Sequence, residues 1–192
     1  MGYFSHCLIF SQQTVIRNEK FWIIGGTDGK IDHANSEFVS LNQPAEEGIF
    51  ESNFWIKKTR HHYFFIGPIL PFTISYHSVL QTDESHVLII GGRQDSYTSE
   101  ETWQYDIDDW SLSEGPPLNV AREGHCCGKI LINDRLFAIV AGGWEEDTVE
   151  LLDLSSKSSW VMGPSLPHQL VGASMIMCPC GDGIIVSLCC IQ

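Results

Sequence analysis

A short apolar run closed by two glycines occurs three times in this 192-residue sequence. Such a run is typical of a buried strand that stops abruptly, because a glycine pair permits positive φ angles and close approach of another backbone. The first glycines of the pairs lie 66 and then 51 residues apart (25 to 91, and 91 to 142), so the runs indicate an internal repeat. The three pairs are Gly25–Gly26, Gly91–Gly92 and Gly142–Gly143.

The residues around the glycine pairs also repeat in one order. A histidine comes upstream of each pair, and an acidic segment, a tryptophan or phenylalanine and a Gly-Pro-x-Leu sequence follow it. Each piece is common, but the combination is specific. The histidines are His6, His77 and His125, the acidic segments are 37–41, 101–106 and 149–153, the tryptophans are Trp110 and Trp160, and the Gly-Pro-x-Leu sequences start at Gly67, Gly115 and Gly163.

This order of residues resembles the kelch repeat, which has a period of about 50 residues and forms one four-stranded propeller blade. The resemblance covers nearly the whole chain. It implies an all-β fold, a partial kelch β-propeller of about three four-stranded antiparallel blades plus the start of a fourth. It also implies that the six paired glycines, Trp110 and Trp160 are structural repeat positions.

The repeat makes residues 1–192 one kelch-repeat region. Only two expected strands, near 172–177 and 184–188, follow the third blade, and no glycine pair comes after them. We therefore expect a fragment of a longer protein or a truncated product, because a closed ring is what protects the blade edges. A small propeller closed by dimerisation is the alternative. The expected blades are 5–71, 74–118 and 124–167, followed by an incomplete blade at 172–192.

Blades two and three have the clearest strand patterns. Asn133 and Asp134 predict a tight hairpin between the first two strands of blade three. The strands of blade two are expected near 74–80, 86–90, 101–106 and 110–113, and those of blade three near 125–132, 135–141, 148–153 and 159–162.

Residues 42–61 interrupt blade one, where the middle blade has only a short turn. We interpret them as a loop insertion, and loops of this length are usually functional or disordered. The fourth strand of blade one is then 62–66, because a Gly-Pro sequence follows it as closely as in the other blades. The alternative places this strand at 53–57, with Trp55 as the repeat tryptophan.

The charge balance bears on the kind of partner. The sequence has 24 acidic and 11 basic residues, a formal net charge of −13. Nucleic acids and anionic membranes attract positive surfaces, so this balance argues against both as partners and permits a basic protein partner. No run approaches the roughly 18 apolar residues of a membrane-spanning helix, and the first residues have no secretory pattern. Seven cysteines then fit a reducing, cytoplasmic environment.

The sequence predicts a non-enzymatic protein without a catalytic site, a cofactor or a metal. One structural histidine per blade explains the repeated histidines better than a metal site does. The spacing of Cys178 and Cys180, and of Cys189 and Cys190, does not match the usual cysteine pairs of a zinc site. The last four residues match a prenylation box formally, but no polybasic segment supports that signal. The sequence has no nucleophile elbow and no phosphate-binding loop.

The loops after the glycine pairs are the candidate interaction surface. In kelch propellers these loops, together with the connections between blades, form one rim that commonly holds a partner peptide, and the resemblance implies the same rim here. The loops at 27–36, 93–100 and 144–147 are rich in carboxylates and contain few basic residues. The candidate partner-binding residues are Arg93, Tyr97, Arg122, Trp144, Glu145 and Glu146.

The resemblance implies a scaffold that binds a protein or a peptide. The chain is similar to the substrate-binding kelch domain of kelch-like ubiquitin-ligase adaptors, which recruit a cullin through a separate BTB domain. That domain is absent from these residues. An actin- or cytoskeleton-associated kelch protein is the alternative function.

Overall fold

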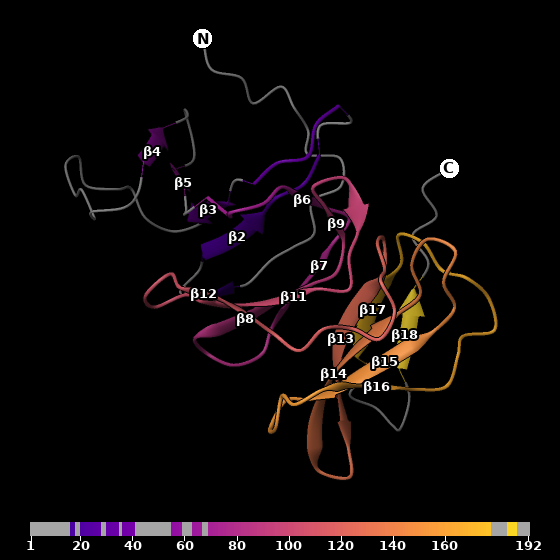
Figure 1. Cartoon of the computed structure of the whole chain (residues 1–192). Coiled ribbons are helices and arrows are strands. Elements are labelled where there is room, and N and C mark those ends of the chain that lie inside the picture. The colour runs from indigo at the N-terminus through magenta and orange to yellow at the C-terminus, as the bar shows by residue number, and fades with distance from the viewer. Residues whose placement is uncertain are drawn as a thin grey trace.

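The computed structural model describes residues 16–17, 20–27, 30–34, 36–40, 55–58, 63–66, 69–177 and 184–187. Within these ranges no helix occurs, so the fold is all-β, as the sequence predicted. All strand pairs there are antiparallel. Figure 1 shows the strands grouped into sheets that follow one another along the chain, and we number these sheets one to four in that order.

Sheets two and three each have four strands, and each strand lies beside the next strand of the same sheet, as in a propeller blade. Asn133 and Asp134 have φ angles of 48° and 60°, which confirms the tight hairpin between the first two strands of sheet three. Sheet two contains β7 (Ser78–Gln81), β8 (His86–Ile90), β11 (Thr102–Asp106) and β12 (Leu112–Glu114), and sheet three contains β13 (Cys126–Ile132), β14 (Arg135–Ala141), β15 (Val149–Asp153) and β16 (Trp160–Met162).

Sheet one has five described strands, and two of them, at residues 16–17 and 55–58, were not expected as strands. Residues 63–66 pair with the third strand, which confirms the favoured position of the fourth strand. Residues 55–58 form a further strand at the outer edge, so the insertion at 42–61 is not entirely a loop. The first residues of the expected blade one, 5–15, lie outside the described residues. The order is β1-β2-β3-β5-β4, from β1 (Ile16–Arg17), β2 (Lys20–Ile24), β3 (Ser36–Ser40), β4 (Trp55–Lys58) and β5 (Tyr63–Ile66).

A small additional sheet forms between sheets one and two, where the sequence predicted one long strand and an irregular loop. Tyr76 has a φ angle of 52°, which interrupts the strand expected at 74–80. The residues before Tyr76 pair with a hairpin that follows Gly92, and an isolated bridge between His33 and Ile74 links them to the loop of sheet one. The small sheet contains β6 (Ile74–Ser75), β9 (Arg93–Gln94) and β10 (Tyr97–Thr98), in the order β10-β9-β6.

Sheet four consists, in the described residues, of the pair β17 (Ser174–Met177) and β18 (Ile184–Ser187). Both strands agree with the predicted start of a fourth repeat. The residues between the two strands, 178–183, lie outside the described residues. β17 contacts β13, and β13 contacts β7, so the first strands of sheets two, three and four are neighbours.

The central strands of sheets two and three are buried on both faces. In β8, Val87 and Ile89 belong to the core shared with sheet one, whereas Leu88 and Ile90 belong to the core shared with sheet three. Burial of these two apolar faces, at about 25 cal/mol for each Å², is the main attraction between neighbouring sheets. The same alternation holds in β14, where Ala138 and Val140 face sheet two and Ile139 and Ala141 face the core that contains Ala173.

The two repeat tryptophans occupy different structural positions. Trp160 is buried between sheets two and three, and its indole N–H donates to the Pro116 carbonyl at 2.9 Å. In the strand register of sheet two, Leu112 corresponds to Trp160, because it stands opposite Tyr105. Trp110 follows the turn at 107–109 and lies two residues before Leu112. It has a φ angle of 65° and meets the Tyr105 ring edge-on, with the ring centroids 6.0 Å apart. The expectation that Trp110 and Trp160 are equivalent is therefore wrong.

The first glycine of each pair generates a stability prediction. A Cβ atom on Gly142 (φ 70°) would lie 2.6 Å from the Leu170 carbonyl oxygen, and one on Gly91 (φ 52°) would be similarly crowded. We expect Gly142→Ala and Gly91→Ala each to lower the free energy of unfolding by more than about 1 kcal/mol, because strain and a backbone clash add. Gly163→Ala is the control, since the nearest atom there is a flexible Leu151 methyl group. Urea unfolding that gives all three variants equal stability would contradict this role for the glycine pairs.

Candidate functional site

Each glycine pair makes a backbone hydrogen bond to the segment that leads into the next sheet. We call these segments, residues 69–77, 117–125 and 165–173, the connecting segments. The second glycine of each pair donates its N–H to a carbonyl of the connecting segment, and the three acceptors are spaced by 48 residues (74, 122 and 170). The bonds run from Gly26 to Ile74 at 2.7 Å, from Gly92 to Arg122 at 2.8 Å and from Gly143 to Leu170 at 2.8 Å.

Two histidines of the repeat are completely buried where the connecting segments pass the glycine pairs. Burial lowers the pKa of His77 to about 4 and that of His125 to about 3, and the positive charge of Arg122 contributes to the second shift. The carbonyls of Ile24 and Ile90 oppose these pKa shifts, although neither imidazole makes a hydrogen bond of normal geometry. Both side chains are therefore neutral packing groups. In the other two repeats, the position of these histidines is occupied by His6, which lies outside the described residues, and by Ala173, which is buried.

Arg122 is completely buried and ties sheet three to its connecting segment. Its guanidinium donates to the Glu150 carboxylate at 2.7 Å, to the carbonyls of Gly142 and Thr148 at 2.9 and 3.0 Å, and to the Thr148 hydroxyl at 3.0 Å. Its own carbonyl accepts the bond from Gly92 of sheet two. Arg122 therefore does not lie on the rim surface, and its burial contradicts the prediction that it contacts a partner.

Glu150 is also completely buried, and its carboxylate accepts further hydrogen bonds where sheet three meets its connecting segment. We call this contact between a sheet and its connecting segment the seam. It accepts the backbone N–H of Asn119 at 2.7 Å and the Asn119 side-chain amide at 2.8 Å. The seam 48 residues earlier is apolar instead. Pro71, Ile74 and Trp103 stand in the places of Asn119, Arg122 and Glu150. Proline has no N–H, so this earlier seam has no donor there for a carboxylate to accept.

The strand register corrects one part of the repeat alignment. Counted from the glycine pairs, Glu150 corresponds to Trp103, and the exposed Glu101 comes two residues earlier. The acidic segment of the middle repeat is therefore not the counterpart of the buried carboxylate. The same repeat position holds Pro71 in one connecting segment and Asn119, which has donors, in the next. This difference is the sequence signal that could have revealed the polar seam.

The two candidate aromatic residues flank one connecting segment. Tyr97 and Trp144 are 78% and 64% exposed, although both are large apolar side chains. The loop of Tyr97 reaches this segment through the Ser99 carbonyl, which accepts the Arg122 N–H at 3.2 Å. Trp144 donates its backbone N–H to the Glu123 carbonyl at 2.9 Å. Backbone bonds thus bring the loops of sheets two and three to the same side of the molecule.

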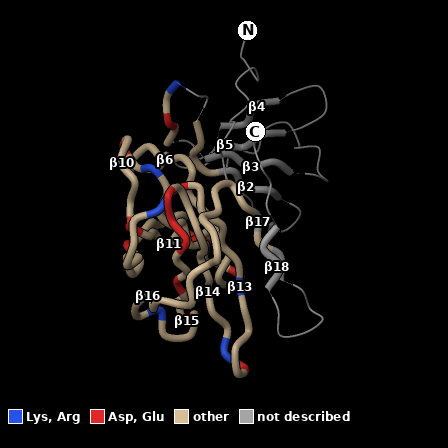
Figure 2. Tube along the Cα trace, turned by 90° about the vertical axis from the view of Figure 1, so that its right-hand side faces the viewer, with Lys and Arg blue, Asp and Glu red and all other residues tan. Residues whose placement is uncertain are grey.

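The charged rim residues are mostly carboxylates. Arg93 is only partly exposed, and its Nε atom lies 3.8 Å from the Asp32 carboxylate. Glu145 is exposed, and the partly exposed Glu146 accepts the Thr148 hydroxyl at 3.2 Å. Figure 2 shows acidic positions spread along the described trace with few basic ones among them. The rim therefore offers negative charge and exposed aromatic surface.

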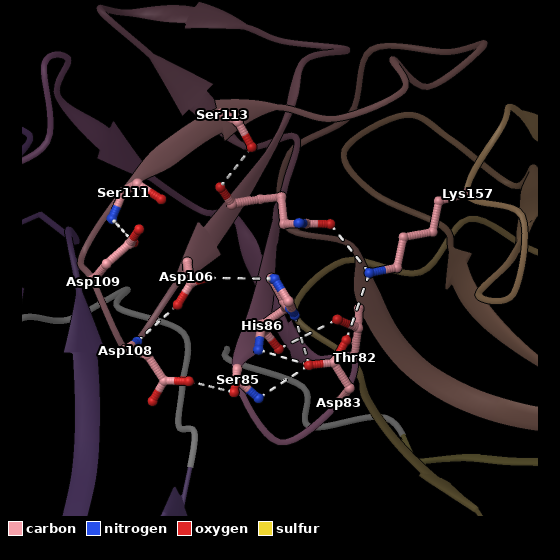
Figure 3. Close-up of polar contacts among 11 residues, drawn as sticks. Thr82, Asp83, Ser85, His86, Asp106, Asp108, Asp109, Ser111, Ser113 and Lys157 are labelled. Carbon is pink, nitrogen blue, oxygen red and sulfur yellow. Dashed lines mark hydrogen bonds and ion pairs between the residues drawn. The ribbon is translucent and has the colours of Figure 1, made fainter.

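A polar cluster that the sequence did not reveal lies at the opposite end of sheet two (Figure 3). His86 Nδ1 lies 2.8 Å from the Asp83 carboxylate, and His86 Nε2 lies 3.5 Å from that of Asp106. Lys157, from the loop between β15 and β16, lies 3.6 Å from Asp83 and donates to Gln104 at 3.1 Å. Hydrogen bonds from His86 and the Ser85 N–H outweigh burial and lower the Asp83 pKa. The cluster joins sheets two and three.

The cluster does not have the geometry of a nucleophilic site. The Ser85 hydroxyl donates to the Asp108 carboxylate and not to His86, so the imidazole is not positioned to activate this hydroxyl as a nucleophile. Among the residues that the structure describes, no group of three or more His, Cys, Asp or Glu side chains is arranged to hold a metal ion. The cluster is best explained as a contact between the two sheets.

Comparisons with known proteins do not place the chain in a family. No family model matches the sequence, and no curated protein matches it. In the described part of the chain, no helix has the length and apolar character needed to cross a membrane.

The buried histidines predict acid sensitivity. The pKa values of His77 and His125 lie below the value of 6.5 in the unfolded chain, so below pH 6.5 the unfolded chain binds more protons than the folded chain. The folded state therefore loses stability as the pH falls from about 6.5 towards 4. We expect each histidine to lower the unfolding free energy by about 2 kcal/mol between pH 6.5 and 5. Urea unfolding at several pH values should give a smaller loss for His125→Ala and an unchanged loss for the exposed control His168→Ala. Equal pH dependence of all three proteins would contradict the assignment.

The buried ion pair predicts a large cost when only one partner is removed. Arg122→Leu leaves the Glu150 carboxylate buried without its cation, and we expect a loss of about 3–5 kcal/mol in unfolding free energy. Arg122→Leu with Glu150→Gln should recover more than about 1 kcal/mol, because the remaining amide is neutral. Arg135→Leu, which breaks an exposed pair with Asp153, is the matched control and should cost less than about 1 kcal/mol. An Arg122→Leu protein as stable as that control would refute this role of the pair.

Proposed function

We propose that this chain is a non-enzymatic protein-interaction scaffold made of kelch-type propeller blades. The observation that carries the proposal is the exposure of Tyr97 and Trp144 on loops that are otherwise fixed by backbone bonds. Aromatic residues are enriched among the residues that dominate binding energy at protein interfaces. A rigid sheet framework presents them at a small entropic cost.

The partner is a protein or a peptide with a basic segment. The rim carries exposed carboxylates, whereas Arg122 is buried and Arg93 lies near Asp32. An acidic peptide would find no free guanidinium at these two positions. A basic segment would be attracted over a distance of about 10 Å at 0.1 M salt.

The resemblance to kelch-like ubiquitin-ligase adaptors suggests the cellular role, with a substrate held at this rim and a cullin recruited by a BTB domain encoded outside these residues. We place this role in the cytoplasm, where cysteine side chains stay reduced. The full-length transcript tests the ligase role directly, since a BTB segment must be encoded in it.

The interaction proposal is tested by comparing two charge-reversed proteins. The double variant Glu145→Lys with Glu146→Lys should fail to capture the proteins that the wild-type chain captures. Capture by the wild type should weaken as the salt concentration rises. Glu84→Lys with Glu114→Lys changes the same net charge at exposed positions outside the rim, and should keep the wild-type partners. The idea fails if both variants keep the same partners with the same salt dependence.

A further inference from the structure

Trp144 is an exposed indole in an unusually acidic setting. It follows Gly143 directly and precedes Glu145, Glu146 and Asp147 in the chain. Within the described residues, the ring–ring contacts and the cation–π contact involve other aromatic residues. The indole face is thus available, and tryptophan is the aromatic side chain that attracts a cation most strongly.

Glu123 supplies a second, independent observation beside this indole. Its carbonyl accepts the Trp144 N–H, so the two residues are adjacent across the seam. Its carboxylate oxygen Oε2 is covered and has no hydrogen-bond donor in the described part of the chain. A covered carboxylate oxygen without a donor is costly, so a donor brought by a partner would be favoured.

The backbone around Trp144 is already fixed. Gly143 donates to the Leu170 carbonyl at 2.8 Å, and the Gln169 side-chain amide donates to the Glu145 carbonyl at 3.0 Å. A fixed loop loses little conformational entropy on binding, which favours a defined subsite over a diffuse charged surface.

We propose that Trp144 and Glu123 form a subsite for one Arg or Lys side chain of the protein partner. The cation lies over the Trp144 indole, and its N–H groups donate to the Glu123 carboxylate after that side chain turns towards it. Glu145 adds negative charge beside the site. This inference rests on the proposed function, and it adds which residue class of the partner is read and where.

The experiment selects ligands from a random library of displayed twelve-residue peptides on the 192-residue chain. An enriched peptide is then made with a fluorescent label, and its affinity is measured by anisotropy. We expect the peptides to contain a required Arg or Lys. Its replacement by citrulline or norleucine, which removes the charge, should weaken binding about 5- to 30-fold. Exchange between Arg and Lys shows which cation fits better.

Variants of the chain test the site itself. Trp144→Leu keeps an apolar surface without the ring, and Glu123→Gln keeps the shape without the charge, so each should weaken binding about 5- to 30-fold. Neither should lose further affinity when the peptide carries norleucine, because the same interaction is already absent. Glu114→Gln, on the outer strand of sheet two, is the control for net charge and should bind as the wild type does.

Two outcomes separate the subsite from the proposed function. If the peptides bind, and Glu145→Lys with Glu146→Lys abolishes binding while Trp144→Leu and Glu123→Gln do not alter it, the subsite is wrong and the rim remains an interaction surface. If no selected peptide is sensitive to any of these rim substitutions, the proposed function fails together with the subsite. Unchanged thermal midpoints of the variants ensure that lost binding is not lost folding.

Discussion

The hydrogen bond from the second glycine of each pair to the connecting segment is the interaction on which the sheet arrangement depends. It joins each sheet to the next at a fixed position of the repeat, with acceptors at residues 74, 122 and 170. The bond requires two backbones to approach where a side chain would otherwise stand. A Cβ on Gly91, the first glycine of the same pair as Gly92, would lie 2.8 Å from the Arg122 carbonyl oxygen. Glycine pairs are therefore required by packing between sheets as well as by the end of a strand.

The same joint is built with two different chemistries in one chain. Sheet three uses a buried ion pair, Arg122 with Glu150, and the Glu150 carboxylate also accepts hydrogen bonds from Asn119 and from the Val120 N–H. Sheet two uses Ile74 and Trp103 at the corresponding places. Buried ion pairs and apolar groups of similar volume are often close in net stability, because desolvation offsets much of the Coulomb attraction. A repeat can therefore exchange one for the other, provided that the backbone donors change as well.

This joint also decides which side chains are left for recognition. The sequence predicts that Arg122 lies on the rim, but its two terminal guanidinium nitrogens donate within the joint and the side chain is completely buried. The bonds around the same connecting segment hold the loops of Tyr97 and Trp144 beside each other. At the other end of sheet two, Lys157 crosses to Asp83 and Gln104 and fixes the two sheets there as well. Sheets two and three are thus held together at both ends, and the acidic rim is the exposed surface at one of these ends.

The sequence by itself determined the all-β fold, most strand positions in sheets two and three, and the strand ends at the glycine pairs, because each depends on local patterns of apolar residues and turn formers. It could not determine the break at Tyr76, the edge strand at residues 55–58, or the difference between Trp110 and Trp160, since these depend on which strands pair and in what register. It also misplaced Arg122. The fate of a charged side chain depends on whether a carboxylate from a distant strand arrives beside it, and Glu150, 28 residues further along the chain (122 to 150), is brought there only by the tertiary structure.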